Sequence, residues 1–398
     1  MKGVLLIVKI LFVTSTPLEY SSSANVRNMA LISGLLQLGH EISTFTAKPE
    51  VSSLFYDGSL VNLKLHKKYY VDIGNIHSMF TSQIQNEKSM KEEIKKKIKK
   101  KFHSLYTSLS IYDPRKRLVS KVKYHSIDEE FDLLISSSDP KSSHLLAEEL
   151  IRIQPNITKK WFQYWGDPFV GDINLSSVLP KKIILKEERR ILNKADRIFY
   201  VSPFTLEKQI ELFPSIINKM SFLPVPYITP IKTVKSNVNN EFKVGYFGDY
   251  YSSDRNIIPL YDAINKTDAE LKVCGNSDIK IAGTSNININ PRVKYELVKK
   301  YESESDLLVC ICNRSGTQIP GKVYHYAATY KPILIVLDGE RKEGLRKYFN
   351  DFERYILCDN SSESIRKAIL KIKNEKKEYK PLEALNAKEI AMKFVESI

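Results

Sequence analysis

Short apolar runs of strand length alternate with stretches of helical period through the first half of the chain. Residues 10–13 form a continuous apolar run, and residues 26–38 then place hydrophobic side chains on one face of a helix that ends at Gly39. The runs at 131–137 and 160–165 repeat the strand pattern, each with a helical segment after it. Because strands that alternate with helices pair side by side, this half predicts a parallel sheet with helices on both faces.

A second alternating series begins after a polar stretch at 228–241, which contains proline, has no apolar period and is typical of an interdomain linker. Strand-like runs resume at 242–247, and an amphipathic segment at 382–398 is predicted to cross back onto the first domain. A chain of 398 residues fits two α/β domains. The pattern therefore predicts two doubly wound parallel sheets, in an N-terminal domain of residues 1–227 and a C-terminal domain of residues 242–381.

The topology of such sheets predicts where ligands bind. In open parallel sheets, ligands lie outside the carboxyl ends of the strands, where the strand order reverses. Two sheets that face each other would place both sets of loops on one cleft. This geometry suits a reaction between two substrates, with one substrate held by each domain.

Charge and cysteine content narrow the class of protein. The chain carries 61 Lys and Arg against 46 Asp and Glu, a formal charge of +15, so phosphates, acidic lipids and nucleic acids are all compatible partners. Four cysteines in the second half have the spacing of neither a zinc site nor a disulfide framework, which favours reduced core thiols and a cytoplasmic protein. The apolar N-terminal run contains Lys9 and is shorter than the ~18 residues of a spanning helix. It is interpreted as the first strand rather than as a signal peptide or anchor.

Much of the excess charge lies in one segment, because residues 91–124 contain 12 basic and 3 acidic side chains. Within it, the apolar residues at helical spacing are Ile94, Ile98, Phe102 and Leu105. A cationic helix with such a stripe is typical of an anionic membrane surface, so residues 91–105 predict a membrane contact. A cationic helix packed on its own domain would show the same period. No segment resembles a base-reading helix or an aromatic stacking platform, so nucleic acid is not an expected partner.

The segment 314–332 carries the clearest chemical signal. It begins at the end of an apolar strand and places Gly316 and Gly321 before a helix predicted over 322–329. Backbone N–H groups at the start of a helix attract anions, and Lys322 in the first turn would add a mobile positive charge. A diphosphate fits such a loop. The alternative is a plain strand-to-helix turn with Lys322 in solvent.

Several segments together resemble the GT-B glycosyltransferases, in particular those of family 4. The stretch IPGKVYHYAATYKPILIV is similar to the donor-site helix of that family, which ends in an alanine-rich turn with Lys-Pro. The other segments that agree in order and spacing are KILFVTS, GHEISTFT, DLLISSSDPKSSHLLA, WFQYWGDPF, KEERRILNKADRIFYVSPFTLE and FKVGYFGDYYSSDRNIIPL. The resemblance covers nearly the whole chain and rests on the ordered set. It implies a GT-B fold of two facing Rossmann-like domains and a nucleotide-sugar donor.

The resemblance also implies roles for residues of the C-terminal domain. Arg255 and Lys322 would neutralise the donor pyrophosphate as it leaves, without a metal ion. The remaining donor-site positions that it implies are Gly248, Asp249, Gly275, Arg314, Gly316, Thr317, Gly321 and His325. An exposed arginine on a helix is the alternative reading of Arg255.

The chain departs from the pattern of family 4 at two of these positions. Many members carry two glutamates eight positions apart, one near the transferred sugar and one on the nucleotide ribose, and the aligned residues here are Thr317 and His325. A neutral imidazole can still hydrogen-bond a ribose hydroxyl, whereas Thr317 offers only a hydroxyl and its backbone. The departure leaves the identity of the donor open. A surface histidine without function is the alternative for His325.

Asp167 is the candidate carboxylate of the N-terminal domain. It lies between Gly166 and Pro168, which predicts a rigid extended turn at a strand end. As a catalytic residue it would orient the acceptor hydroxyl or take its proton as a general base. A turn-forming aspartate is the alternative. Asp139 is expected to cap the following helix rather than to act in catalysis.

These features predict a glycosyltransferase that moves a sugar from a UDP- or GDP-sugar to a saccharide or lipid-linked acceptor. By resemblance, the configuration would be retained, and the product would be a surface polysaccharide, lipopolysaccharide or glycolipid. No cofactor or metal is expected besides the nucleotide-sugar substrate, and the expected location is the cytoplasmic face of the cell membrane. Two alternatives stay open: a non-catalytic subunit that binds a nucleotide-sugar or glycan, and a GT-B nucleotide-sugar epimerase.

Overall fold

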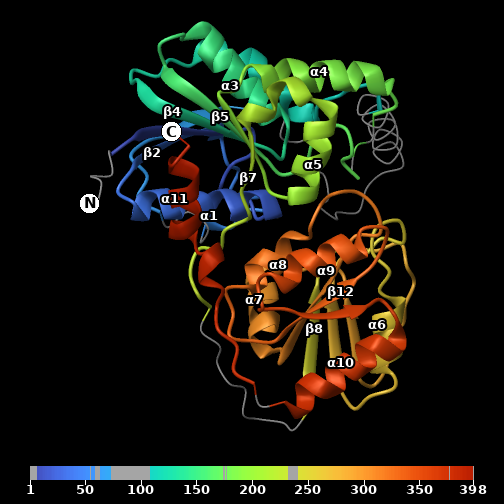
Figure 1. Cartoon of the computed structure of the whole chain (residues 1–398). Coiled ribbons are helices and arrows are strands. Elements are labelled where there is room, and N and C mark those ends of the chain that lie inside the picture. Colours follow the sequence, from blue (N-terminus) through green and yellow to red (C-terminus); the bar gives the residue numbers. More distant parts are fainter. Residues whose placement is uncertain are drawn as a thin grey trace, which may run out of the picture. The chain divides into compact units, whose positions relative to one another are not determined.

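The chain folds into two compact units, which Figure 1 shows in a computed structural model. Unit 1 comprises Met1–Leu223 and Ala391–Ile398, and unit 2 comprises Pro224–Ile390. The residues that the structure describes are 7–53, 55–58, 63–72, 108–173, 175, 177–231, 241–375 and 377–397. The predicted cationic helix at 91–105 lies outside them. Among the described residues, no helix has both the length and the apolar character needed to span a membrane.

Unit 1 is built on a seven-stranded parallel sheet with the strand order β3-β2-β1-β4-β5-β6-β7. Its elements in chain order are β1 (Lys9–Thr14), α1 (Ser23–Gln37), β2 (Glu41–Ala47), β3 (Lys68–Val71), η3 (Pro114–Tyr124), β4 (Phe131–Ser137), α3 (Ser142–Ile153), β5 (Thr158–Trp165), α4 (Lys181–Asn193), β6 (Arg197–Tyr200), α5 (Pro203–Leu212), η4 (Pro214–Lys219) and β7 (Met220–Phe222). The first strand therefore lies inside the sheet, as the apolar run at 10–13 predicted.

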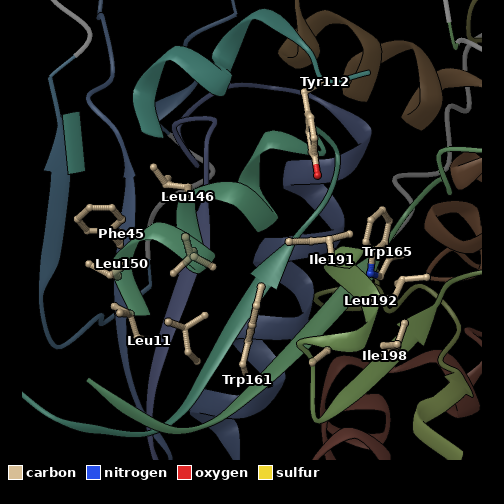
Figure 2. Close-up of a cluster of buried hydrophobic side chains, with 14 of the residues drawn as sticks. Leu11, Phe45, Tyr112, Leu146, Leu150, Trp161, Trp165, Ile191, Leu192 and Ile198 are labelled. Atoms are coloured by element: carbon tan, nitrogen blue, oxygen red, sulfur yellow. The ribbon is translucent and has the colours of Figure 1, made fainter. Parts of the chain in front are cut away.

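The core of unit 1 lies between this sheet and its helices. Strand β1 is buried on both faces from Ile10 onward, which explains why its sequence is continuously apolar rather than alternating. Figure 2 shows side chains of β5, α3 and α4 in one buried cluster, among them Trp161, Leu146 and Ile191. Because the core fixes the strands, the loops after their carboxyl ends are held in defined positions.

Unit 2 contains a six-stranded parallel sheet with the strand order β10-β9-β8-β11-β12-β13. Its elements in chain order are β8 (Lys243–Phe247), α6 (Ile258–Ile264), β9 (Glu270–Cys274), β10 (Ile287–Asn290), α7 (Tyr295–Glu304), β11 (Leu307–Ile311), α8 (Gly321–Tyr326), β12 (Ile333–Leu337), α9 (Lys342–Asn350), β13 (Ile356–Asp359), α10 (Ser362–Asn374) and η5 (Glu383–Leu385). Helices α6 and α10 pack against each other, as Figure 1 shows. The predicted pair of parallel α/β sheets is confirmed.

Some elements of unit 2 differ from the prediction. Helix α8 ends at Tyr326, three residues before the predicted end of the helix at 322–329. Strand β10 has the sequence ININ, in which two asparagines leave no apolar run, so its pattern did not predict a strand. Helices α7 and α9 were also not predicted. Both are strongly polar overall and bury only one or two residues each, so neither contains an apolar run that marks it in the sequence.

The chain passes from unit 1 to unit 2 after Leu223 and returns to unit 1 after Ile390. Unit 1 ends at Leu223, and Tyr227 pairs with Asn386 inside unit 2, so the linker predicted at 228–241 begins after the crossing. The last helix, α11 (Ala387–Val395), starts in unit 2 and ends in unit 1. Its Phe394 ring lies 4.5 Å from the ring of Phe199 and 5.7 Å from that of Phe162, measured between centroids. The end of this helix thus packs against strands β5 and β6 of unit 1.

Candidate functional site

In unit 2, the strand order reverses between β8 and β11, which run side by side from the middle of the sheet. Chain segments leave these two strands in opposite directions, so a crevice for ligands forms at their carboxyl ends. The residues that follow the strands are Gly248 after β8, Gly275 after β9 and Asn313 shortly after β11. The predicted donor-site residues therefore gather at one edge of one sheet.

The packing of unit 2 requires glycine at position 275 but not at position 248. A Cβ atom on Gly275 would collide with the carbonyl oxygen of Gly248, so the two strand-end loops touch through their backbones. A Cβ atom on Gly248 would meet no atom within 4 Å, and Gly248 has no positive φ. The packing of unit 2 accounts for Gly275 and leaves the space in front of Gly248 open.

Arg255 is held at this edge by three polar contacts. Its Nε donates to Oδ1 of Asn313 at 2.9 Å, and its Nη1 donates to the carbonyl oxygen of Asp249 at 2.9 Å. A further hydrogen bond joins it to the side chain of Tyr246. The cation is thus fixed between the loops that follow β8 and β11. Sequence reasoning missed Asn313, although a polar run directly after an apolar strand is a signal that would have pointed to it.

The loop between β11 and α8 is tied to the loop before α6. The backbone N–H of Arg314 donates to the carbonyl oxygen of Asp254 at 2.8 Å, and its Nη1 donates to the carbonyl oxygen of Ser252 at 3.1 Å. Gly316 has a φ of 83°, a left-handed conformation that favours glycine. Thr317 is buried, and its N–H donates to the side chain of Gln318 at 3.1 Å. The turn is therefore shaped by Gly316, and Arg314 stays exposed at its start.

Lys322 is not the mobile cation that the sequence predicted. Its Nζ lies 2.5 Å from Oε1 of Glu302, a carboxylate of α7 that is 8% exposed. Burial pushes the pKa of Glu302 upward, but Lys322, His325 and Tyr326 together outweigh burial, and the net shift is downward. Helix α8 also has only six residues, beginning at Gly321, so its dipole alone makes a weak anion site. Sequence reasoning missed Glu302, which lies on a helix that it did not predict.

His325 lies beside this ion pair on α8 and is half-buried. Burial lowers its pKa to about 4; Glu302 works in the opposite direction, while Lys322 adds to the decrease. The imidazole is therefore neutral at pH 7. Burial also raises the pKa of Cys310 in β11 to about 12, and Lys322 and Arg255 both oppose that shift. Both cations thus lie within electrostatic reach of the same strand.

In unit 1, three aspartates gather around one lysine after the carboxyl ends of β4 and β5. The Nζ of Lys141 lies 3.1 Å from Oδ1 of Asp139 and 2.5 Å from Oδ2 of Asp172. Asp167 hydrogen-bonds to Asp139. Burial, followed by the charges of Asp139 and Asp172, raises the pKa of Asp167 well above its ordinary value, although Lys141 opposes the shift. The surroundings of the predicted base therefore favour its protonated form.

A second cation, Arg27, lies against the turn that carries Asp167. The Arg27 side chain is buried, and its Nη2 donates to the carbonyl oxygen of Ser138. A Cβ atom on Gly166 would collide with Nη1 of Arg27 and would lie 3.1 Å from Oδ2 of Asp139. Gly166 is thus required because Arg27 and Asp139 approach its backbone from one side.

Asp139 does not cap α3 as predicted. The residue before the helix is Lys141, which makes no side-chain capping bond. Asp113, which lies 29 positions before Ser142 in the sequence, provides the cap instead. Its Oδ2 accepts from the N–H of Ser142 at 3.0 Å, and its Oδ1 accepts from the Ser142 hydroxyl at 2.8 Å. Asp139 is therefore available for another role.

Two cavities lie at the opposite edges of the sheets. One of about 570 Å³ in unit 1 is lined by residues at the starts of β5 and β6, including Lys160 and Asp196. Another of about 470 Å³ in unit 2 is lined by residues at the starts of β8 and β9, including Lys243 and Glu270. Ligands of open parallel sheets bind at the carboxyl ends, so neither cavity is the candidate site.

Comparison with solved structures finds folds of the same kind. Sucrose-phosphate synthase from Thermosynechococcus elongatus matches with 14% identity over 98% of this chain and 94% of that chain, with a TM-score of 0.56. Anabaena HepE in complex with UDP matches with 13% identity over 98% and 95%, with a TM-score of 0.53. A glycosyltransferase from Rickettsia africae matches with 14% identity over 98% and 93%, with a TM-score of 0.51.

No protein-family model matches the chain, and no curated protein matches it in sequence. The similarity to solved structures extends over nearly the whole chain and both units. At this level of identity it shows the fold alone. The chain has the two-unit α/β architecture of the GT-B proteins, so the fold expected from the sequence is confirmed. Membership of family 4 stays a prediction.

Proposed function

We propose that the protein is a glycosyltransferase that binds a nucleotide-sugar in unit 2 and an acceptor hydroxyl in unit 1. The observation that carries the proposal is the fixed cation Arg255 at the switch point of the second sheet, next to the open space in front of Gly248. A diphosphate needs a cation and room beside it, and this edge supplies both. The fold supports the proposal, because Anabaena HepE, which is similar to this chain, binds UDP.

The proposed reaction needs charge stabilisation on the donor side. When the bond between the sugar and the diphosphate breaks, negative charge develops on the leaving oxygen. Arg255 is the residue proposed to stabilise it without a metal ion, with Arg314 close by on the next loop. Two roles are proposed for Lys322. It could reach the diphosphate if its ion pair with Glu302 breaks, or it could stay paired with Glu302 and bind hydroxyl groups as a neutral pair. Neutral His325 is proposed as a hydrogen-bond partner of the nucleotide.

The finer parts of the proposal rest on the sequence. The cationic stripe at 91–105 supports a lipid-linked acceptor and a location on the cytoplasmic face of a membrane. The resemblance to family 4 supports retention of configuration and a role in surface polysaccharide or glycolipid synthesis.

The donor site is tested by a thermal-shift panel of UDP, GDP, CMP and ADP. At least one nucleotide is expected to raise the melting temperature, because a ligand that binds the folded state stabilises it by mass action. Arg255→Ala should weaken binding of that nucleotide about 10- to 100-fold, since a hydrogen bond to a charged group contributes ~1.5–3 kcal/mol. Arg366→Ala on α10 is the matched control, because that arginine pairs only with Glu363 among the described residues.

The two glycines separate binding from folding. Gly275→Ala should lower the melting temperature without nucleotide, because its methyl group would collide with Gly248. Gly248→Ala should leave the melting temperature of the free protein unchanged and reduce the nucleotide-induced shift. A shift of normal size in both Gly248→Ala and Arg255→Ala would remove the donor site from this edge. Nucleotide binding without transfer to any acceptor would instead favour a binding subunit.

A further inference from the structure

The aspartate cluster of unit 1 contains one more carboxyl group than it has cations. Two cations, Lys141 and Arg27, lie within the cluster, against three carboxyl groups of Asp139, Asp167 and Asp172. Lys141 and Arg27 are both buried. A net charge in such a place is costly, and one proton on the carboxyl groups makes the cluster neutral. The count therefore favours a single retained proton.

The three carboxyl groups are not equivalent. Asp172 is 7% exposed and is engaged by Lys141, whereas Asp139 is 36% exposed. Asp139 gives one oxygen to Lys141, and its other oxygen lies on the side of Gly166 and Arg27. Asp167 hydrogen-bonds to Asp139 rather than to Lys141 among the contacts that the structure describes. Two carboxyl groups joined in this way must share a proton, because two carboxylates repel each other.

The surroundings agree on which carboxyl group keeps it. The pKa of Asp167 is raised well above its ordinary value by burial and by the two neighbouring aspartates. Asp139 forms an ion pair with Lys141, whose pKa is raised by Asp139 and Asp172 against the effect of burial.

Two further titratable groups lie near the cluster. His144 of α3 is buried and has a pKa well below its ordinary value, so it contributes no charge. Glu188 of α4 interacts with Lys141, and burial raises the pKa of Glu188 to about 7.

We propose that Asp139 and Asp167 form a carboxyl–carboxylate pair in which Asp139, not Asp167, is the catalytic base for the acceptor hydroxyl. Asp167 is the protonated member, which donates a hydrogen bond to Asp139 and positions it. This inference rests on the proposed function and adds a residue to its acceptor side. Aspartate pairs that share a proton titrate as a unit, so the pair works only in the singly protonated state.

The chemical step balances with these groups alone. The acceptor oxygen forms a bond to the anomeric carbon of the donor on the face from which the diphosphate leaves, as retention of configuration requires. The bond from that carbon to the diphosphate oxygen breaks, and its electron pair stays on the diphosphate. The proton of the acceptor hydroxyl moves to the carboxylate of Asp139, which returns it to water before the next cycle.

The shared proton is tested first without any substrate. Isotope-edited infrared spectra of protein labelled with [4-13C]aspartate report aspartates only, so Glu188 does not interfere. At pH 7, the wild type should show a protonated aspartate that Asp167→Asn lacks. Asp128→Asn, an exposed aspartate of the same unit, is the matched control and should keep it. A wild type with all its aspartates ionised at pH 7 would overturn the proposal, whatever the activity of the protein.

The roles of the two residues are separated by their amide variants. Transfer is measured with the nucleotide-sugar whose nucleotide raises the melting temperature, and with a panel of glycosides and lipid-linked saccharides. Asp139→Asn should lose at least 100-fold in kcat. Asp167→Asn should keep activity within about tenfold, because its amide still donates where the protonated acid donated. The decrease in kcat at high pH should disappear in Asp167→Asn, since that variant has no second proton to lose.

The outcomes distinguish this inference from the proposed function. Loss of activity in Asp167→Asn with retention in Asp139→Asn would reverse the assignment. Nucleotide binding is measured in every variant by thermal shift and should be unchanged, because the pair lies in unit 1 and the donor site in unit 2. Absence of nucleotide binding in the wild type would contradict the proposed function but leave the infrared result standing. Tryptophan fluorescence of Trp165, next to Gly166, checks that the variants fold.

Discussion

Glu188 is a buried acid outside the reactive cluster. Its side chain lies in the core face of α4 with 1% of the residue exposed, and its two oxygens accept from the N–H groups of Phe169 and Val170. These bonds hold the chain just after Asp167. Burial raises the pKa of Glu188 to about 7, although the two N–H groups oppose the shift. The residue therefore orders the turn of the proposed acceptor site and titrates near neutral pH.

This shift makes the stability of unit 1 depend on pH. Above the ordinary pKa of 4.5, the unfolded chain loses the proton of Glu188, while the folded chain keeps it up to about pH 7. The free energy of unfolding should therefore decrease between pH 4.5 and 7, by about 3 kcal/mol, and stay level above that range. The difference between wild type and Glu188→Gln in urea unfolding isolates this effect. Glu207→Gln, an exposed glutamate, should show no such pH dependence.

At the scale of elements, helix α3 begins with a cap from a distant segment. Asp113 precedes η3, yet it accepts hydrogen bonds from the N–H and hydroxyl of Ser142 and from the N–H of Arg115. The start of α3 follows directly on Lys141, so the same aspartate steadies the reactive cluster. Two short elements are thus joined by one side chain that satisfies the first N–H group of each.

Removal of the Asp113 cap should destabilise the start of α3 without creating a cavity in the core. Asp113→Ala should lower the free energy of unfolding by about 1–2 kcal/mol, the usual effect of losing a helix cap. Asp113→Asn should lose less, because its amide oxygen still accepts one of the bonds. Urea unfolding followed by tryptophan fluorescence measures both variants, with Asp128→Ala as the control on an exposed aspartate. Equal stability of Asp113→Ala and wild type would show that water replaces the cap.

At the scale of the whole molecule, the C-terminal helix packs against the N-terminal sheet. Phe394 is fully buried, and its ring lies against the rings of Phe162 and Phe199 in β5 and β6. The last helix of the chain therefore contributes a side chain to the core of unit 1. Both tryptophans of the sequence, Trp161 and Trp165, lie in β5 of this unit, so their fluorescence reports unit 1 alone.

The contact of Phe394 predicts a large effect from a distant part of the sequence. Phe394→Ala should lower the stability of unit 1 by about 3–5 kcal/mol, because it leaves a cavity among aromatic rings. The fluorescence-detected urea transition should shift to lower denaturant concentration. Lys393→Ala, on the exposed face of the same helix, should leave the transition unchanged. A transition that Phe394→Ala does not move would mean that the last helix packs without stabilising the first sheet.

Hydrophobic pattern alone determined most of the elements and both sheets. Buried parallel strands must be continuously apolar, and runs such as 10–13 and 131–137 carry that signal in the sequence itself. The resemblance predicted Arg255 and Gly248 as donor-site residues, and the structure has both in the loop after the carboxyl end of β8. Their role in binding a donor stays a prediction. The sequence did not predict polar elements such as β10 and α7, because their sequences contain no run of apolar residues.

Pairing between distant polar side chains was decided only by the tertiary structure. Nothing in the sequence around Lys322 indicates that Glu302, on another helix, neutralises it. Likewise, Asp139 and Asp167 are 28 positions apart and come together because β4 and β5 are neighbours in the sheet. The charge state of an ionisable group depends on burial and on which charges face it, and both arise from packing. The sequence therefore determined where the candidate sites lie, and the fold decided which of their groups are charged.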